Sequence, residues 1–582
     1  MTIQIATTFN SDKKYNYFQG LTNARPDKDS NALWFRLPDT LKWSLKNKKI
    51  WLESKIKTAL KDKQNTKKLI KEVFVELLST LETWFTDEQI IKIVDNFDKF
   101  NNDLIVPITN LENFDYLIEE FHWPTDAFKD IALQLVTSMV STIVEEENKI
   151  AIKKAKNWDR WQKLKFVITL TSTSWDTWPA WWSWIEWKNF VMNVIWYPEN
   201  EATFAQKWQM EILWWNVKAL SMNSSFSNIQ EYMLKANTPE YKDELKKIIE
   251  KEFNDLIEEY WFEIEIDAWS FNSINPWRVD GQTIYHSYSI LQAKANDIIN
   301  ENEDVLEVIP SWNGWHMFSV LMARLMTEQK WKTIVTCNRN NMFYRIIEEG
   351  RFKKTESNSA IDEPSVSMII EYPNNMIRLF AYAFWEKRAE DITTKFFAWE
   401  EVIFTDKEIN ILKEEIWLVW VEVTWIEELQ TIWEIFIRTG TLVCPHTANA
   451  IKWLEKYRKN SWDSQTKSLI SATASPWKFL AATATWLSYK ETDNLEELYK
   501  EYKKLENSRE WVLELLKIIE TKYQNFWKTF NINILPKNLR QIYNNGYKTN
   551  TPCSSQEFPN KTIEFLKTQV ASQFRAQVEQ YI

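Results

Sequence analysis

Residues 304–326 read DVLEVIPSWNGWHMFSVLMARLM and contain a complete strand, turn and helix. The run DVLEVIP is typical of a buried strand, and HMFSVLMARLM has the apolar spacing of a helix. The same order recurs elsewhere, with strand candidates KFVITL (165–170), FVMNVIWYP (190–198) and KTIVTCN (332–338) and a helix candidate PTDAFKDIALQLVTSMVSTIV (124–144). This alternation predicts an α/β fold with mostly parallel sheets flanked by helices.

A chain of 582 residues can form two or three domains. We expect a small N-terminal domain over residues 1–105, with helices around 50–84 and 87–99. Residues 106–490 should form the α/β core, in which about 150–235 make a smaller mobile subdomain. The tail, 491–582, is expected to be a helical extension, because charged helical segments dominate it.

The composition disfavours several classes of protein. No run of about 18 apolar residues is present, so we expect no membrane span. The first residues, MTIQIATTFNSDKK, lack the order of a secretion signal, and the net charge of −10 disfavours a nucleic-acid surface. Cys337, Cys444 and Cys553 form no CxxC motif, which argues against a disulfide framework or a zinc site. We therefore expect a soluble, cytoplasmic protein.

The glycine and tryptophan contents are anomalous. The chain has 6 Gly and 35 Trp, whereas globular proteins carry roughly 7% Gly. In TSTSWDTWPAWWSWIEW (171–187), six Trp stand among turn-forming residues without a helical or strand period. We interpret most of the Trp as glycine positions, as arises when UGA codons that specify glycine are translated as tryptophan. The alternative is a genuine Trp-rich protein, such as one that binds carbohydrate.

One lysine has a position suited to covalent chemistry. In FHWPTDAFKDIALQ (121–134), Thr125 or Asp126 can cap a helix whose apolar stripe includes Phe128 and Ile131. Lys129 then lies in the first turn, where the helix dipole and an apolar wall favour the neutral amine that a Schiff base needs. By position alone, a solvated surface lysine is the commoner occurrence.

Two loops that follow strands have the composition of anion-binding turns. With Trp312 and Trp315 taken as glycine, IPSWNGWHMFSV (309–320) becomes a glycine-rich turn whose backbone N–H groups can face a phosphate. TSTSWDTWPAWW (171–182) combines hydroxyl groups with inferred glycines, which suits a carboxylate or a phosphate. An ordinary βα turn and a surface loop are the respective alternatives.

Taken in this order, the segments resemble threonine synthase, a fold-type-II enzyme that uses pyridoxal 5'-phosphate (PLP). FHWPTDAFKD is similar to the family's PLP-lysine motif, TSTSWDTWPA to its substrate loop and IPSWNGWHMF to its phosphate loop. The other similar segments are FNSINPWRVDGQ (271–282), PSVSMIIEYPNNMIRLF (364–380), LVCPHTANA (442–450) and SATASPWKF (471–479). Trp stands where these motifs carry glycine in the family, which supports the glycine interpretation.

The resemblance implies a role for each matching residue. Lys129 would carry PLP, Thr473 would hydrogen-bond its pyridine nitrogen and Asp176 would lie near its ring hydroxyl. The residues that would hold the cofactor phosphate are Ser311, Trp312, Asn313, Gly314 and Trp315. The residues that would bind the substrate are Thr173, Ser174 and Thr177 at its carboxylate, and Ser273, Asn275 and Arg278 at its phosphate.

The implied reaction converts O-phospho-L-homoserine and water to L-threonine and phosphate. The implied protein is a monomer or homodimer with no metal and with no nucleic-acid or membrane partner. Asp126, His316 and Cys444 depart from the family's usual residues, which bears on fine specificity. Two alternatives remain: a related PLP lyase acting on another phosphorylated or sulfonated amino acid, and the Trp-rich carbohydrate-binding protein.

Overall fold

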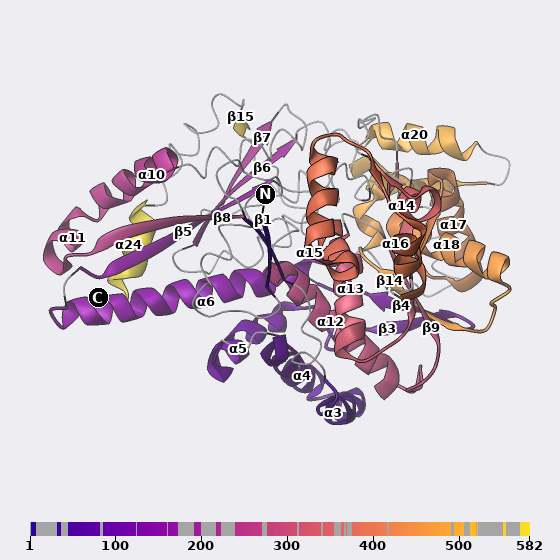
Figure 1. Ribbon diagram of the computed structural model, residues 1–582, viewed down its shortest axis with the longest axis horizontal. Coiled ribbons are helices and arrows are strands. Elements are labelled where there is room, and N and C mark those ends of the chain that lie inside the picture. The colour runs from indigo at the N-terminus through magenta and orange to yellow at the C-terminus, as the bar shows by residue number, and fades with distance from the viewer. Residues whose placement is uncertain are drawn as a thin grey trace. The chain divides into compact units, whose positions relative to one another are not determined.

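The computed structural model of the chain is shown in Figure 1. It describes residues 2–6, 32–36, 45–172 (without 82–84, 124 and 160), 191–198, 217–222, 239–338 (without 271–275 and 311–313), 342–353, 363–365, 368, 375–505 (without 416–417 and 491–493), 513–519, 521, 551–553 and 571–582. Two compact units are present. The first contains Met1–Lys14, Ala24–Ile131 and Val279–Tyr543, and the second contains Tyr15–Asn23, Ala132–Arg278 and Asn544–Ile582.

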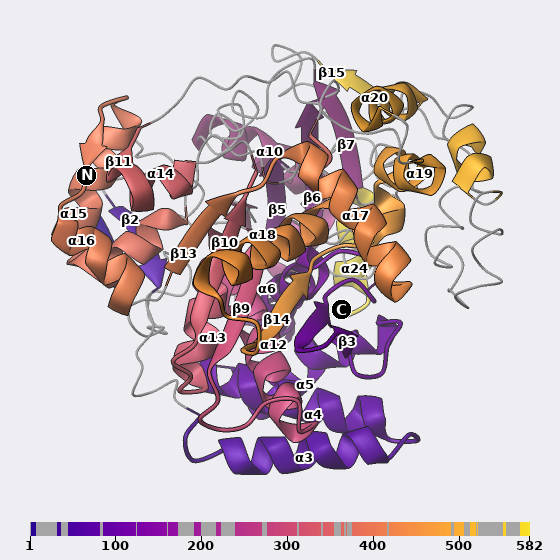
Figure 2. The ribbon, with the colours of Figure 1, turned by 90° about the vertical axis from the view of Figure 1, so that its right-hand side faces the viewer.

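A six-stranded sheet forms the centre of the first unit (Figure 2). Its order is β13 (Leu418–Glu422), β10 (Lys332–Cys337), β9 (Val305–Pro310), β14 (Lys467–Ala472), β4 (Asp115–Glu119) and β3 (Ile108–Glu112). Neighbouring strands are parallel except for the antiparallel pair of β3 and β4. β9 is buried along its whole length, because α13 (Trp315–Met326) and α18 (Pro445–Ser461) both pack against it.

The α/β class predicted from the sequence is confirmed by these elements. The strand, turn and helix predicted over 304–326 are β9 and α13. The other predicted strands are found as β5 (Lys163–Ser172), β6 (Val191–Pro198) and β10. The predicted long helix is α6 (Lys129–Lys156). It begins later than the cap predicted at Thr125 or Asp126, so Phe128 precedes the helix.

Helices also occupy the two stretches predicted near the N-terminus. The first stretch contains α3 (Lys49–Lys61) and α4 (Thr66–Leu81) rather than one continuous helix. The second contains α5 (Asp87–Val94) and the 3-10 turn η2 (Asp95–Lys99). Thr86 starts α5 with a capping box. Its hydroxyl accepts from the Gln89 N–H, and the Gln89 side chain accepts from the Thr86 N–H.

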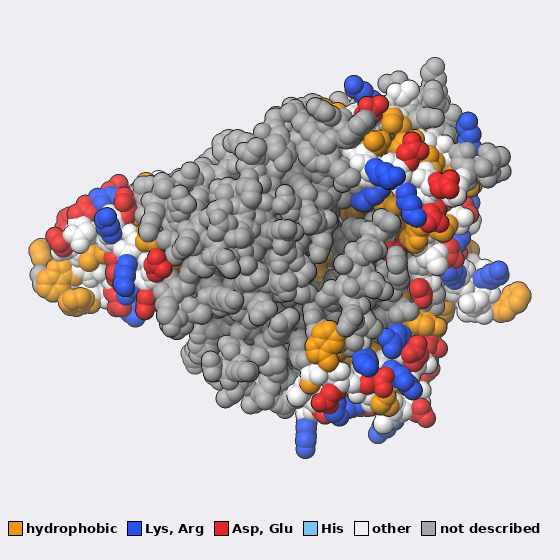
Figure 3. Space-filling model, turned by 90° about the horizontal axis from the view of Figure 1, so that it is seen from above, with side chains coloured by type: hydrophobic (Ala, Val, Ile, Leu, Met, Phe, Trp, Pro, Cys, Tyr) orange, Lys and Arg blue, Asp and Glu red, His pale blue; other side chains and the backbone are white. Residues whose placement is uncertain are grey.

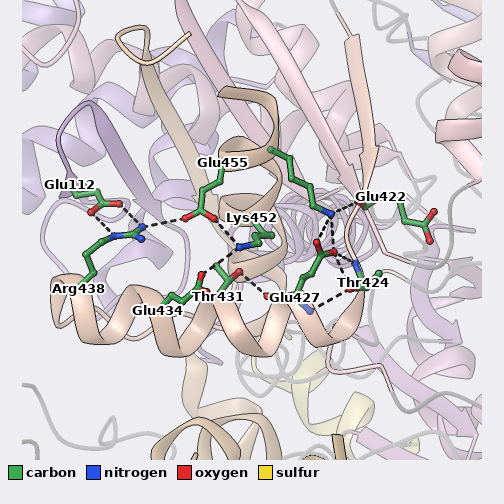
Figure 4. Close-up of polar contacts among 10 residues, drawn as sticks. Glu112, Glu422, Thr424, Glu427, Thr431, Glu434, Arg438, Lys452 and Glu455 are labelled. Carbon is green, nitrogen blue, oxygen red and sulfur yellow. Dashed lines mark hydrogen bonds and ion pairs between the residues drawn. The ribbon is translucent and has the colours of Figure 1, made fainter. Parts of the chain in front are cut away.

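An ion-pair network joins α17 (Trp425–Thr439) to α18 (Figure 4). Glu455 of α18 lies 3.3 Å from Arg438 of α17 and 3.2 Å from Lys452. At the other end of α17, Lys456 donates to Glu427 at 2.8 Å. Isolated exposed pairs contribute little to stability, but linked charges such as these hold two neighbouring helices in one register.

A five-stranded parallel sheet forms the second unit. Its order is β15 (Thr551–Cys553), β7 (Val217–Met222), β6, β5 and β8 (Glu263–Ser270). α10 (Pro239–Glu252) packs against β8 and against α24 (Ala571–Glu579). β15 and α24 come from the expected C-terminal extension, so part of that segment packs with this unit. The domain boundaries expected at residues 105 and 490 stay a prediction.

The remaining elements complete the two units. They are β1 (Thr2–Ala6), β2 (Ala32–Arg36), α11 (Asn254–Tyr260), α12 (Pro276–Ala295), α14 (Met342–Glu349), β11 (Arg351–Phe352), α15 (Met376–Phe397), β12 (Val402–Ile403), α16 (Asp406–Asn410), η4 (Ile411–Glu415), η5 (Pro476–Lys478), α19 (Leu480–Ser488) and α20 (Leu495–Leu505). Among the described residues, no helix is both long and apolar enough to cross a bilayer. Charged side chains of both signs intermingle over the described parts of the face shown in Figure 3.

Tryptophan is frequent at backbone positions that ordinarily require glycine. Of the described non-glycine residues with positive φ, half are Trp, namely Trp158, Trp161, Trp261, Trp399 and Trp462. Trp261 and Trp462 follow the ends of α11 and α18 in the left-handed conformation, with φ of 58° and 57°. Glycine is the usual residue there because it has no Cβ. The Trp462 side chain is 92% exposed, so burial of the indole does not offset the strain.

Candidate functional site

Lys129 is the first residue of α6 and is only 2% exposed. Its Nζ atom lies 5.6 Å from the centre of the Phe128 ring. The preceding loop is held by Thr125, whose N–H and hydroxyl donate to the two carboxylate oxygens of Asp130 at 3.0 and 2.8 Å. Asp126 has a left-handed φ of 57°, which Asp tolerates better than most residues. The loop therefore presents a lysine inside the protein at a helix start, where positive charge is disfavoured.

Backbone hydrogen bonds attach this loop to the segment that follows β14. The Phe128 N–H donates to the Thr473 carbonyl at 2.8 Å, and the Ser475 N–H donates to the Asp126 carbonyl at 2.9 Å. Ala127 and Ala474 form an antiparallel bridge between these contacts. Thr473 is thereby placed beside the residue that precedes Lys129. The Thr473 hydroxyl is buried and has no hydrogen-bond partner among the described residues, so a bound group can use it.

Further ionisable groups are buried in the same loop. Lys478 is 3% exposed and donates from Nζ to the Thr125 carbonyl at 3.1 Å. Burial raises the pKa of Asp130 to about 7, against the lowering effect of its hydrogen bonds from Thr125 and of Lys478. Burial also raises the pKa of Asp126 well above its usual value, and Lys478 opposes this shift. The surroundings of Lys129 therefore penalise charged forms.

The start of α13 contacts the same loop through Phe128. Gly314 is the N-cap residue, with a left-handed φ of 83°, and it supplies no side-chain cap to the first turn. Trp315 and His316 stack on the Phe128 ring, with ring centres 5.2 and 5.1 Å away. A helix start without a side-chain cap, next to a buried lysine, is suited to an anionic group such as a phosphate.

The structure brings together four of the predicted site residues, Lys129, Gly314, Trp315 and Thr473. The others that belong to the cofactor set, namely Asp176, Ser311, Trp312 and Asn313, lie outside the described residues. So do the substrate-binding candidates Thr173, Ser174, Thr177, Ser273 and Asn275. Their roles stay predictions.

Arg278 is the last residue of the second unit's central segment and lies near the start of α12. It is 2% exposed. Burial lowers the pKa of Arg278 to about 9. The phosphate-binding role that the sequence suggests for Arg278 stays a prediction.

Two buried features were not singled out from the sequence. Lys478 belongs to the quoted segment SATASPWKF, but an isolated lysine carries no signal of burial. Glu120, His286 and His316 form a buried group in the first unit. They lie far apart in the sequence, so no spacing motif could have indicated that they meet.

The chain is similar in sequence to curated threonine synthases. It is 26% identical to the Saccharomyces cerevisiae protein over 294 residues, which are 49% of this chain and 50% of that protein. It is 25% identical to the Pseudomonas aeruginosa protein over 391 residues, which are 66% of this chain and 72% of that protein. The chain thus matches about half the length of the yeast relative. No protein-family model matches the chain.

Solved structures of threonine synthases share the fold. The yeast structure has a TM-score of 0.64 at 20% identity, covering 86% of this chain and 89% of that one. The Brucella melitensis structure, described as PLP bound, has a TM-score of 0.60 at 19% identity, covering 86% and 88%. The Escherichia coli structure has a TM-score of 0.55 at 17% identity, covering 94% and 96%. The predicted fold-type-II architecture is confirmed.

Proposed function

We propose that this protein is a threonine synthase that uses PLP to convert O-phospho-L-homoserine and water into L-threonine and phosphate. The observation that carries the proposal is the attachment of the Lys129 loop to Thr473, which places a buried lysine near a buried, unpartnered hydroxyl. The similarity to curated threonine synthases supports it. In the wider classification the activity is that of a carbon–oxygen lyase acting on a phosphate ester.

The described residues fit PLP at three points. Lys129 would carry the cofactor, the Thr473 hydroxyl would hydrogen-bond the pyridine nitrogen, and the α13 start at Gly314 would bind the phosphate. The residues proposed to complete the site are Asp176, Ser311, Trp312, Asn313 and Trp315. When bound, PLP supplies an electron sink for carbanion chemistry. Thr473 is a neutral partner, so it does not enforce protonation of the ring nitrogen as a carboxylate would.

Lys129 also has the properties of the proton carrier. With substrate bound, its Nζ would remove the proton from the substrate Cα and later one from Cβ. This role requires an uncharged amine, which the buried position and the helix start both favour. After the γ-phosphate has left, Cγ would take up a proton, water would add to Cβ and give up one of its protons, and Cα would be reprotonated to complete L-threonine. Bulk water must be kept out until that step, for which we propose closure of the smaller subdomain.

We assign substrate binding to residues that offer hydrogen-bond donors to the phosphate and to the carboxylate of the substrate. Arg278 would bind the leaving phosphate, because its guanidinium presents a fork of N–H groups. Ser273 and Asn275 would assist it. Thr173, Ser174 and Thr177 would bind the carboxylate.

We further propose that most of the Trp positions carry glycine in the protein as its cell makes it. The five Trp with positive φ support this, because only glycine adopts that conformation without strain. Trp312 and Trp315 belong to the phosphate loop, where the cofactor needs close approach to the backbone. Trp123 is different: it is buried and donates to the Ile105 carbonyl at 2.6 Å. Genomic codons decide each position, with TGA supporting glycine and TGG opposing it.

The test uses protein made with glycine at positions 312 and 315, and at position 123 only if its codon is TGA. We expect a near-visible absorbance band of lysine-bound PLP, a borohydride-trapped adduct on Lys129, and threonine formed in step with phosphate release. Lys129→Ala should abolish all three, while Lys153→Ala, at an exposed position in the last turn of the same helix, should keep them. Phosphate or sulfite release from a different amino acid, without threonine, would establish the alternative lyase. Absence of PLP binding by the glycine-containing protein would overturn the proposal.

We also propose the coarser organisation that the sequence suggests. Residues 106–490 would form the PLP-binding catalytic core, residues 1–105 a small N-terminal domain, and residues 491–582 a C-terminal region. The enzyme would be cytoplasmic and would act as a monomer or homodimer, which sedimentation analysis measures directly.

A further inference from the structure

Three side chains from separate elements meet in the core of the first unit. Glu120 directly follows β4, His286 lies in α12, and His316 is the second residue of α13. All three are at most 1% exposed. One ligand atom from each, a carboxylate oxygen or a ring nitrogen, lies within 4.8 Å of those of the other two. The cluster is therefore built by the tertiary structure from segments distant in the sequence.

Several polar atoms of this cluster lack hydrogen-bond partners. Among the described residues, no hydrogen bond reaches Glu120 Oε1, His316 Nδ1 or either ring nitrogen of His286. Buried polar atoms are nearly always hydrogen-bonded, so several such atoms at one place require a specific explanation. A bound group that accepts the lone pairs of these atoms would explain why they lack hydrogen-bond partners.

We propose that Glu120, His286 and His316 bind one divalent transition-metal ion of the Zn²⁺ class. Two imidazoles and one carboxylate are donors that suit such ions, whereas Ca²⁺ and Mg²⁺ prefer sites made of oxygen atoms. The ion would join the end of β4 to α12 and α13 and so stabilise the packing of these elements. This proposal does not depend on the proposed function.

Neighbouring groups orient the ligands. The Tyr285 hydroxyl donates to Glu120 Oε2 at 3.0 Å, and the Gln282 amide donates to that hydroxyl at 2.8 Å. Glu120 Oε2 is thereby occupied, and Oε1 remains for the ion. Ser471 Oγ lies 3.4 Å from His316 Nε2. Hydrogen bonds of this kind, one step outside the ligands, fix ligand orientation in metal sites.

The donor atoms of the three side chains must move closer together to bind the ion. The two imidazole rings stack with centres 4.9 Å apart and planes inclined by 27°, and His316 Nε2 lies 3.9 Å from Glu120 Oε1. Ligand distances of about 2 Å require donor atoms no more than about 4 Å apart, with the ion near each ring plane. Binding of the ion would therefore require the His286 ring to rotate out of the stack.

The experiment measures metal binding directly on the full chain after treatment with a chelator. Co²⁺ is added to one equivalent, visible d–d absorption is recorded, and bound metal is quantified after gel filtration. We expect one tightly bound ion per chain and an increase in thermal stability on addition of Zn²⁺. His286→Phe and His316→Phe should abolish the band, and Tyr285→Phe should weaken binding by about 10- to 100-fold.

A matched control separates the cluster from adventitious binding. His122 and Glu119 form another imidazole–carboxylate pair, which is partly exposed, and His122→Gln should leave the band unchanged. Glu120→Gln preserves the shape of the cluster and should still abolish tight binding if the chain folds, as circular dichroism will show. The proposal is overturned if the wild type binds no stoichiometric ion, if His122→Gln removes the binding, or if a crystal structure grown with Zn²⁺ shows a water molecule between the three side chains. Because the readout is metal rather than threonine formation, these results leave the proposed function untouched.

Discussion

The backbone N–H of Phe128 donates a 2.8 Å hydrogen bond to the carbonyl of Thr473, across more than three hundred residues of sequence. This contact sets the position of Lys129, the next residue, relative to the unpartnered Thr473 hydroxyl. A second hydrogen bond, from the Ser475 N–H to the Asp126 carbonyl, keeps the loop from rotating about the bond between Phe128 and Thr473. Both hydrogen bonds join main-chain atoms, so side-chain substitutions can test the chemistry of the site without breaking these bonds.

Thr473→Val should weaken PLP binding and leave the fold intact. Valine has the shape of threonine but cannot hydrogen-bond the pyridine nitrogen, and a single such bond contributes roughly 0.5 to 1.5 kcal/mol, or about 2- to 10-fold in affinity. PLP titration of the glycine-containing protein measures the change. Thr485→Val is the control, because the Thr485 hydroxyl is equally buried but donates to the Ala481 carbonyl of its own helix. Equal PLP affinities for the two variants would contradict the assignment of Thr473.

Lys478→Met should reduce the free energy of unfolding by about 1 to 3 kcal/mol, because it leaves the buried Thr125 carbonyl without this donor. The substitution removes the positive charge that faces Asp126 and Asp130 and the donor to the Thr125 carbonyl. Urea denaturation followed by fluorescence measures it. Lys467→Met, which breaks the partly exposed pair with Glu303, should cost at most about 1 kcal/mol. Similar losses in both variants would show that Lys478 does not compensate the buried carboxyl groups.

Glu428→Gln should make stability less dependent on pH above pH 5. Burial raises the pKa of Glu428 to about 8, against the lowering effect of hydrogen bonds from Ser365 and Asn449. The folded state therefore holds a proton that the unfolded state releases near pH 4.5. The stability from this group is complete below that pH and is lost as the pH rises through about 8. Thermal unfolding between pH 5 and pH 8 should show a shallower decline in the variant than in the wild type.

Glu427→Gln is the control for this prediction, because the pKa of Glu427 is shifted in the opposite direction to that of Glu428. Burial would raise the pKa of Glu427, but hydrogen bonds from Lys456 and Thr424 lower it below its usual value. Its contribution is present above about pH 4.5 and is lost as the solution becomes more acidic. The Gln variant should therefore change the acid limb of the stability profile. A change in the same direction in both variants would contradict the opposing effects of burial at Glu428 and of pairing at Glu427.

Trp462→Gly should raise the free energy of unfolding of the Trp-containing chain by about 1 kcal/mol, because a left-handed conformation costs a residue with a Cβ roughly that much. The indole is exposed, so its removal sacrifices little packing. The reciprocal control is Gly440→Trp. Gly440 follows the end of α17 in the same conformation, with φ of 75°, and the substitution should be destabilising by a similar amount. Destabilisation by Trp462→Gly would oppose the glycine interpretation at that position.

Local patterns are sufficient to predict much of the fold. The apolar run of 304–310 and the helical spacing of 316–326 depend on neighbours within a few residues, and β9 and α13 are found there. Lys129 is recognisable in the same way, as a residue at a helix start followed by an apolar stripe. The predicted cap is misplaced because Thr125 bonds to Asp130 while Asp126 turns into the left-handed region. Composition also reveals the Trp anomaly without any coordinates.

Sequence alone therefore determined the α/β class, because strands and helices are encoded by residue types that interact over short distances. Lys129 and the glycine-like loops were singled out by the order of the motifs, and their roles stay predictions. Only the tertiary structure decided which distant groups meet. β4 and β14 are parallel neighbours, with Ile118 opposite Ser471 and Glu119 opposite Ala472. Their chains leave the sheet at the same edge, which brings Glu120 and the Lys129 loop to Thr473. The burial of Lys478 and the meeting of Glu120, His286 and His316 follow from the same packing, and no spacing along the chain could have revealed them.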